Sequence, residues 1–222
     1  GSCNELSPRE RAPSFMQMDG RSLGFVDDIF DAVREDRALQ HIAHPELVLH
    51  ELIRVLKPGG RFVLFEPDWE LFIIANSAHN LTRSILNYWA DQFMNGWIGR
   101  ELYQICTNAG VCEVSVLPRT MILHDLQICD RIFGIRETVS RACDTGVIAK
   151  NEGSRWLDEL EGADRKGTFF SSFTGYLITG KNDEVCNALA FPLFRKLPCI
   201  SMVWWFVWDP MIKLMLIPSI TV

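Results

Sequence analysis

The sequence predicts an α/β fold with a parallel pair of strands, because the stretch 25–69 alternates strand-like and helix-like patterns. Two observations carry this prediction. Compact apolar runs at 29–34 and at 62–65 have the character of buried strands. An amphipathic segment that begins at Pro45 lies between them. A strand, a helix and a strand in this order form a βαβ unit with a right-handed crossover.

The composition is that of a globular protein, with 48% hydrophobic and 23% charged residues among 222. The net charge is -6 and no Lys/Arg run occurs, so nucleic acid is not expected as a partner. Seven cysteines are present without a Cys-x-x-Cys pair, and no metal-ligand spacing stands out. Reduced thiols in a cytoplasmic protein, without a metal site, are therefore expected.

The elements can be justified in chain order. Residues 14–18 alternate between apolar and polar side chains, which is typical of a short strand before a turn. The helix from Pro45 ends at Lys57-Pro58-Gly59-Gly60, since Pro suits a first helical position and Gly a stop. The strand at 62–65 is expected to end at Pro67. One core-facing stripe has the i, i+3, i+4, i+7 spacing of a helix: Leu49, Leu52, Ile53 and Leu56.

The remaining elements follow from periodicity and from Gly and Pro positions. Helices are predicted near 77–93, 100–109, 130–143 and 151–163, and strands near 111–117, 120–123 and 168–179. Residues 1–182 are thus taken as one domain and residues 183–222 as an apolar, Trp-rich tail of unknown role.

The tail is almost wholly apolar at 200–207, but Asp209, Pro210 and Lys213 interrupt the run. It is therefore shorter than the ~20 residues that a membrane-spanning helix needs. A spanning helix and a membrane-surface or partner-binding segment remain open. A loosely packed or non-native terminus is favoured over both.

The stretch around the βαβ unit resembles class I S-adenosylmethionine-dependent methyltransferases, and among them the type 11 small-molecule group. The resemblance rests on the segments Asp19-Gly20-Arg21-Ser22-Leu23-Gly24-Phe25, Asp28-Ile29-Phe30-Asp31-Ala32-Val33, His44-Pro45-Glu46 and Arg54-Val55-Leu56-Lys57-Pro58-Gly59-Gly60. It covers about residues 14–182, and the Val-Leu-Lys-Pro-Gly-Gly turn is its most specific part. It implies a Rossmann-like, doubly wound α/β sheet with S-adenosylmethionine as cofactor.

The resemblance also implies site residues. Asp19 matches the acidic residue that faces the adenine amino group, and Gly20 lets the backbone approach closely. Glu35, Asp36 and Gln40 match positions near the methionine part of the cofactor. A solvated ion cluster is the alternative role for the two acidic residues among these three.

Substrate residues are implied after the next strand. Asp68 and Trp69 match a loop that faces the substrate in the family, and packing against the core is the alternative role for the tryptophan. His41 lies near the presumed cofactor edge, although a lone histidine is more often structural or solvated. No catalytic residue is assigned, because methyl transfer often needs only the positioning of two reactants.

The chain departs from the family in lacking its acidic-Gly-x-Gly-x-Gly turn, so an N-terminally truncated domain is expected. The first hypothesis is methyl transfer to a small-molecule acceptor, in an enzyme whose full-length chain supplies the missing turn. The second is a non-catalytic, truncated domain that acts at most as an interaction module. A nicotinamide-dependent oxidoreductase is the third, but its Gly-x-Gly-x-x-Gly turn is also missing. The methyl acceptor and the oligomeric state stay open.

Overall fold

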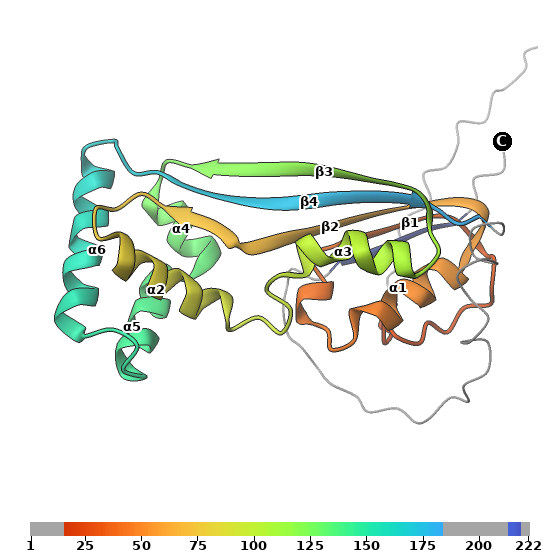
Figure 1. Ribbon diagram of the computed structural model, residues 1–222, viewed down its shortest axis with the longest axis horizontal. Coiled ribbons are helices and arrows are strands. Elements are labelled where there is room, and N and C mark those ends of the chain that lie inside the picture. The colour runs from red at the N-terminus through yellow and green to blue at the C-terminus, as the bar shows by residue number, and fades with distance from the viewer. Residues whose placement is uncertain (1–15, 184–212, 219–222) are drawn as a thin grey trace, which may run out of the picture.

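The computed structural model describes residues 16–183 and 213–218, which form a mixed sheet with helices packed along it (Figure 1). The strands lie in the order β3-β4-β2-β1-β5. Their bounds are β1 Phe30–Asp36, β2 Leu56–Ile74, β3 Cys112–Leu123, β4 Ser171–Lys181 and β5 Lys213–Pro218. β1 and β2 are parallel, whereas the other neighbouring pairs are antiparallel. The α/β, Rossmann-like class and the parallel pair are thus confirmed.

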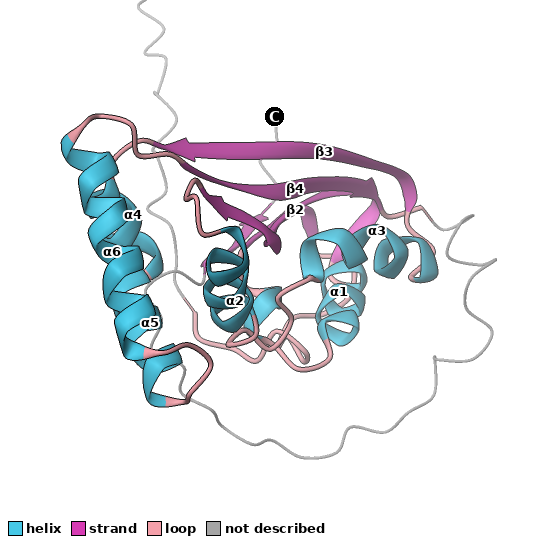
Figure 2. Cartoon of the chain, turned by 60° about the vertical axis from the view of Figure 1, so that its left-hand side comes forward, coloured by secondary structure: helices cyan, strands magenta, loops and turns pink. Residues whose placement is uncertain are grey.

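The helices gather at two ends of the long strands, with α1 and α3 at one end and α2, α4, α5 and α6 at the other (Figures 1 and 2). Their bounds are α1 Pro45–Arg54, α2 His79–Ala90, α3 Ile98–Asn108, α4 Leu126–Phe133, α5 Ile135–Asp144 and α6 Lys150–Arg165, with a short 3-10 turn η1 at Leu39–His41. Each group encloses its own core. The first contains Leu49 and Leu64, and the second contains Trp89 and Trp156.

Helix α1 begins at Pro45, as predicted, and buries Leu49, Leu52 and Ile53 against the sheet. The helix ends at Arg54 and β2 begins at Leu56, so Leu56 and the Lys57-Pro58-Gly59-Gly60 segment belong to the strand and not, as expected, to the helix and its end. Gly59 has a φ of +82°, a left-handed value that favours glycine. The start of the helix and its stripe at Leu49, Leu52 and Ile53 were thus predicted, whereas its end was predicted too late.

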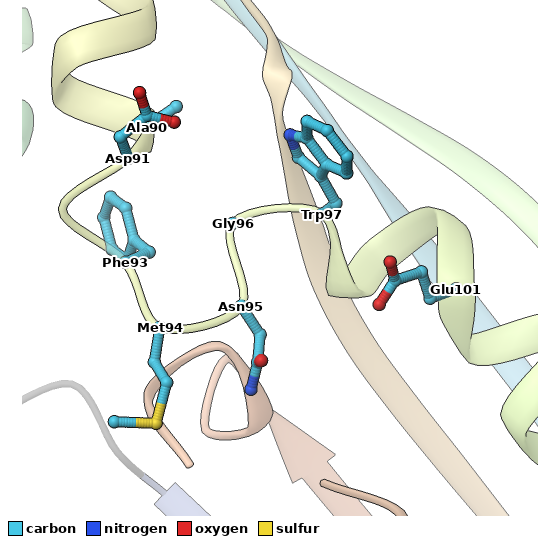
Figure 3. A pocket seen from close by; sticks show the side chains of 8 residues that line it. All are labelled: Ala90, Asp91, Phe93, Met94, Asn95, Gly96, Trp97 and Glu101. Atoms are coloured by element: carbon cyan, nitrogen blue, oxygen red, sulfur yellow. The ribbon is translucent and has the colours of Figure 1, made fainter. Parts of the chain in front are cut away.

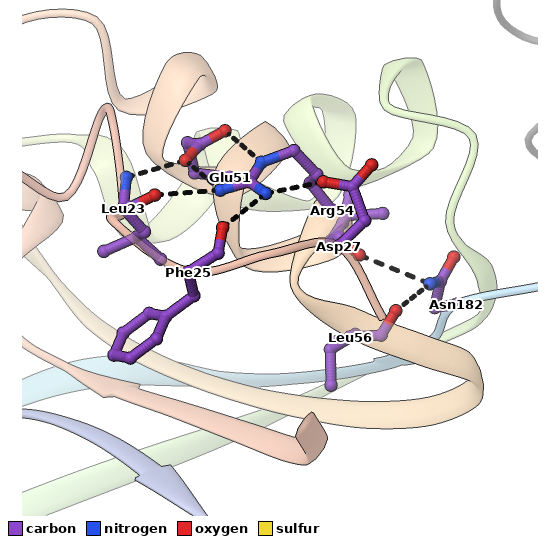
Figure 4. Close-up of polar contacts among 8 residues, drawn as sticks. Leu23, Phe25, Asp27, Glu51, Arg54, Leu56 and Asn182 are labelled. Carbon is purple, nitrogen blue, oxygen red and sulfur yellow. Dashed lines mark hydrogen bonds and ion pairs between the residues drawn. The ribbon is translucent and has the colours of Figure 1, made fainter. Parts of the chain in front are cut away.

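Arg54 fastens the segment that precedes β1 to helix α1 (Figure 4). Its guanidinium donates to the backbone oxygens of Leu23 at 3.0 Å and Phe25 at 2.8 Å, and it pairs with Asp27 at 2.6 Å. Glu51 completes the arrangement, because it accepts from Arg54 at 2.7 Å and from the backbone nitrogen of Leu23 at 2.7 Å. One arginine near the helix end thus positions the chain that leads into β1.

Strand β2 is longer than predicted, because it runs through Pro67 to Ile74. Pro67 has no N–H to give to a neighbouring strand. Its partner in β4 is Gly175, and β4 continues to pair with β2 to Ile74, beyond the point where β1 ends at Asp36. The expectation that the strand ends at Pro67 was therefore wrong, and the residues after it belong to a strand.

Three smaller expectations were also wrong. Strand β3 is continuous through Pro118, which an edge strand tolerates because one of its sides needs no backbone donor. The helix expected at 130–143 is divided at Gly134, whose φ is +61°. Residues 16–18 form no strand, and positions 14 and 15 lie outside the described residues.

Cys106, Cys129 and Cys143 are free thiols, whereas Cys112 is disulfide-bonded, which corrects the expectation of reduced thiols at that position. Within residues 16–183 and 213–218, no helix combines the length and apolar character needed to cross a membrane. The tail expected at 183–222 contributes strand β5, and most of it lies outside the described residues.

Candidate functional site

The candidate site lies where β1 ends and its parallel pairing with β2 stops, at the edge where ligands bind in open α/β sheets. The chain leaves β1 after Asp36 and forms the short turn η1 before α1. Glu35 is fully buried at this edge, and Gln40 on the turn is 3% exposed. Both positions were predicted near the cofactor.

Gln40 connects the turn to β2. Its side-chain oxygen accepts a hydrogen bond from Trp69 Nε1 at 2.6 Å, and its side-chain nitrogen donates to the Arg37 carbonyl at 2.9 Å. Trp69 lies in β2 and not in a loop, and it is buried beside the rings of Trp89 and Phe93 at centroid distances of 4.8 and 5.2 Å. The structure therefore brings Gln40 and Trp69 together, and the tryptophan connects the candidate site to the aromatic core.

Asp68 is also part of β2, so its expected loop position was wrong as well. Asp68 is 1% exposed, and its carboxylate accepts two hydrogen bonds from Arg100, one from Nε at 2.5 Å and one from Nη2 at 2.7 Å. The same guanidinium pairs with Glu70 at 2.8 Å and lies 5.5 Å from the ring centroid of Trp97. The paired carboxylates raise the pKa of Arg100. Asp68 thus holds the start of α3 against β2.

The other predicted positions do not take part in the Gln40–Trp69 contact. Asp36 pairs with Arg34 at 2.9 Å and with Arg37 at 2.8 Å, which agrees with the ion-cluster alternative. Asp19 pairs with Arg21 at 2.8 Å, and this hydrogen-bonded arginine lowers the pKa of Asp19. Gly20 lies against α1, because a Cβ there would be 3.4 Å from Val48.

Glu66 was missed by the sequence analysis, although it lies beside Glu35 at the strand edge. Both residues are fully buried. Glu35 Oε1 accepts from the Ala38 nitrogen at 2.6 Å, and Glu66 Oε1 accepts from the Leu39 nitrogen at 2.5 Å. Burial raises the pKa of Glu35 to about 7, and burial together with the charge of Glu35 raises the pKa of Glu66 well above its usual range. No local pattern marks a buried glutamate before Pro67.

A second missed segment, residues 93–97, closes over the turn. Three hydrogen bonds position Asn95. Its backbone nitrogen donates to the Gln40 carbonyl at 3.0 Å, and its side-chain amide donates to the carbonyls of Leu39 at 3.0 Å and Ile42 at 2.6 Å. Trp69 donates its backbone N–H to the Gly96 carbonyl at 2.9 Å. The turn, β2 and this segment therefore form one connected structure.

A small pocket of about 250 Å³ lies on the outer side of this structure, between the end of α2 and the start of α3 (Figure 3). Figure 3 shows the ring of Phe93 on one side of the loop and the ring of Trp97 on the other. The full lining is Ala90, Asp91, Phe93, Met94, Asn95, Gly96, Trp97 and Glu101. Aromatic and carboxylate groups together suit a small organic molecule.

The side chains supplied by β1 and β2 at this edge include the carboxyl groups of Glu35, Asp36, Glu66 and Asp68. Glu35 and Glu66 are buried, whereas Asp36 and Asp68 are paired with arginines. In the described part of the chain, no three His, Cys, Asp or Glu side chains are arranged to hold a metal ion.

Comparison with known proteins finds similarity in the first part of the chain. Residues 2–64, which include β1, η1 and α1, match the family model described as a methyltransferase domain. A demethylmenaquinone methyltransferase of Clavibacter sepedonicus is 48% identical over 52 residues, which are 23% of this chain and 21% of that protein.

Two longer matches extend further. An uncharacterized 37.1 kDa protein in transposon TN4556 of Streptomyces fradiae is 35% identical over 164 residues, which are 73% of this chain and 46% of the relative. The chain thus spans about half the length of that relative. The YcgJ protein from Bacillus subtilis, whose crystal structure is known, is 20% identical in sequence. The match covers 77% of this chain and 71% of the YcgJ chain, with a TM-score of 0.45. The match to the methyltransferase-domain model is thus confined to residues 2–64.

Proposed function

We propose that the chain takes part in methyl transfer from S-adenosylmethionine to a small-molecule acceptor. The observation that carries this proposal is the meeting of Glu35, Gln40 and Trp69 where β1 ends and its pairing with β2 stops, because the first two were assigned to the cofactor side and the third to the substrate side. The methyltransferase-domain match at residues 2–64 supports it. When bound, S-adenosylmethionine supplies a methyl group on a positively charged sulfur.

The cofactor residues of this proposal are Glu35, Asp36 and Gln40 at the strand edge, with Asp19 and Gly20 ahead of β1. The role of the chain is to bind and orient the two reactants, which is sufficient to accelerate a bimolecular reaction strongly. No proton-transfer residue is required for the proposal.

The acceptor side is the pocket between α2 and α3. Its Phe93, Met94 and Trp97 side chains favour a small molecule with an apolar or aromatic part. A volume of about 250 Å³ is below the range of drug-sized pockets, which favours a compact acceptor. Asp68 and Trp69 contribute by holding the pocket segment against β2.

Isothermal titration calorimetry with S-adenosylhomocysteine tests the proposal. The chain is expected to release or absorb heat on binding, and Trp69→Phe is expected to weaken binding by removing the hydrogen bond to Gln40. Trp156→Phe is the matched control, because that indole also donates a buried hydrogen bond, at 2.9 Å to Thr82, but at the other end of the sheet. Absence of binding heat would overturn the proposal and favour the non-catalytic alternative. Equal weakening by both variants would remove Trp69 from the site.

A further inference from the structure

Glu35, assigned above to the cofactor side, forms a buried carboxyl pair with Glu66. Each uses one oxygen to accept a backbone N–H, from Ala38 at 2.6 Å and from Leu39 at 2.5 Å. The second oxygens, Glu35 Oε2 and Glu66 Oε2, are buried and have no hydrogen-bond partner among the described residues. Buried acceptors without a donor are rare in folded proteins, so this arrangement needs an explanation.

A shared proton explains it. Two ionised carboxylates in one buried place repel each other strongly and both lose their hydration. One proton between them removes one charge and turns one oxygen into a donor for the other carboxyl group. The neighbouring strands supply the geometry, since Glu35 lies near the end of β1 and Glu66 follows Phe65, the last residue of β2 that pairs with β1.

The pair is connected to the site through the two amides that it accepts. Ala38 and Leu39 begin the turn whose next residue, Gln40, accepts from Trp69 Nε1. The carbonyls of Leu39 and Gln40 accept from Asn95, in the segment that lines the pocket. A change at the carboxyl pair therefore reaches both the cofactor side and the substrate side of the site.

We propose that Glu35 and Glu66 hold one proton between them and act as positioning residues, which keep the turn 38–42 seated on β2. Loss of that proton places two negative charges behind the turn and releases it from β2, together with the 93–97 segment. The inference concerns the free protein, so it does not depend on methyl transfer, and its test contains neither cofactor nor acceptor.

Other charged groups surround the pair but do not replace its proton. They are Arg34 and Asp36 on β1, Arg37 and His41 on the turn, Asp68 and Glu70 on β2, and Arg100 and Glu101 on α3. Asp36 is neutralised by two arginines, and Asp68 by Arg100. His41 on the same turn can also titrate near neutral pH, so the glutamine variants below, which leave His41 in place, decide which group causes a change.

Hydrogen exchange measured by NMR tests the proposal, with protection factors that divide out the intrinsic pH dependence of exchange. In the unmodified chain, the Ala38 and Leu39 amides are expected to be protected at acidic pH and to lose at least tenfold in protection as the pH rises through about 7 and beyond. Amides of α6 serve as an internal reference, because they are remote from the pair.

Variants separate a shared proton from simple packing. Glu66→Gln keeps the shape and supplies a permanent N–H donor, so protection of the two amides is expected to persist at alkaline pH. Glu35→Gln is expected to do the same and serves if the first variant does not fold. Glu137→Gln changes an exposed carboxylate on α5 and is expected to leave the pH profile unchanged. A flat profile in the unmodified chain, or an alkaline loss that survives in the glutamine variants, would overturn the proposal.

Discussion

Replacing Arg100 by methionine is expected to destabilise the fold by about 3 kcal/mol, because it leaves the Asp68 carboxylate buried without a partner. The side chain of Asp68 is 2% exposed, and two short hydrogen bonds from Arg100 are lost together. Removing one member of a buried pair costs roughly 3–5 kcal/mol. The lower end applies here because the Arg100 side chain is 38% exposed, so water screens the pair.

Urea denaturation of Arg100→Met, followed by tryptophan fluorescence and evaluated by linear extrapolation, measures this loss. The double variant Asp68→Asn/Arg100→Met is expected to recover part of it, since no buried charge remains. Arg136→Met is the control: it removes an exposed ion pair with Glu161 at 2.8 Å and is expected to cost under about 1 kcal/mol. Equal losses for Arg100→Met and Arg136→Met, or no recovery in the double variant, would refute the reasoning.

Three further predictions concern stability. Glu35→Gln is expected to raise the free energy of unfolding above pH 7 by about 3 kcal/mol, measured by urea denaturation on both sides of that pH. The pKa of Glu35 rises from 4.5 to about 7 on folding, so the folded chain binds the proton more tightly, and the unmodified protein loses stability as the pH rises between these values. A free energy of unfolding that does not change with pH over this range would contradict the prediction. Gly99→Ala is expected to lower the thermal midpoint, because its Cβ would lie 2.7 Å from the Pro67 oxygen. Gly162→Ala, whose Cβ would have only the end of the Arg165 side chain at 4.0 Å, is expected to raise the midpoint by increasing helix propensity. Asn182→Ala is expected to cost about 1–3 kcal/mol in urea denaturation, because the carbonyls of Ile53 in α1 and Leu56 at the start of β2 lose their buried donor, and an unchanged midpoint would argue against that role.

Local signals were sufficient for the βαβ unit. Each signal acts over a few residues and can be recognised in the sequence. These signals are the first helical position at Pro45, the apolar stripe of α1 and the glycine turn at Gly59. Glu35 and Gln40 were assigned through the family resemblance, and they lie at the end of β1 and on the turn after it; their cofactor role stays a prediction. The elements of the βαβ unit were predicted because their causes are short-range.

The errors have long-range causes. Pro67 and Pro118 were expected to end strands, but β4 supports both strands from residues far along the chain. Glu66 had no local sign of its role, because its burial depends on the strand beside it and on the turn above it. The partner of Asp68 is Arg100, at a separation of 32 residues, and no spacing rule connects them. Such pairings can be found only once the sheet order is known.

The pairing of β1 with β5 sets a limit on when the fold can be completed during synthesis. Ala32, near the start of the described chain, pairs with Ile217, near its end. The β1–β2 pair, by contrast, joins residues that leave the ribosome soon after one another. A growing chain therefore displays one open side of β1 until residues 213–218 have been translated, and an unpaired strand edge invites pairing with other chains. Slow translation of the segment between β1 and β5 would lengthen this exposed interval.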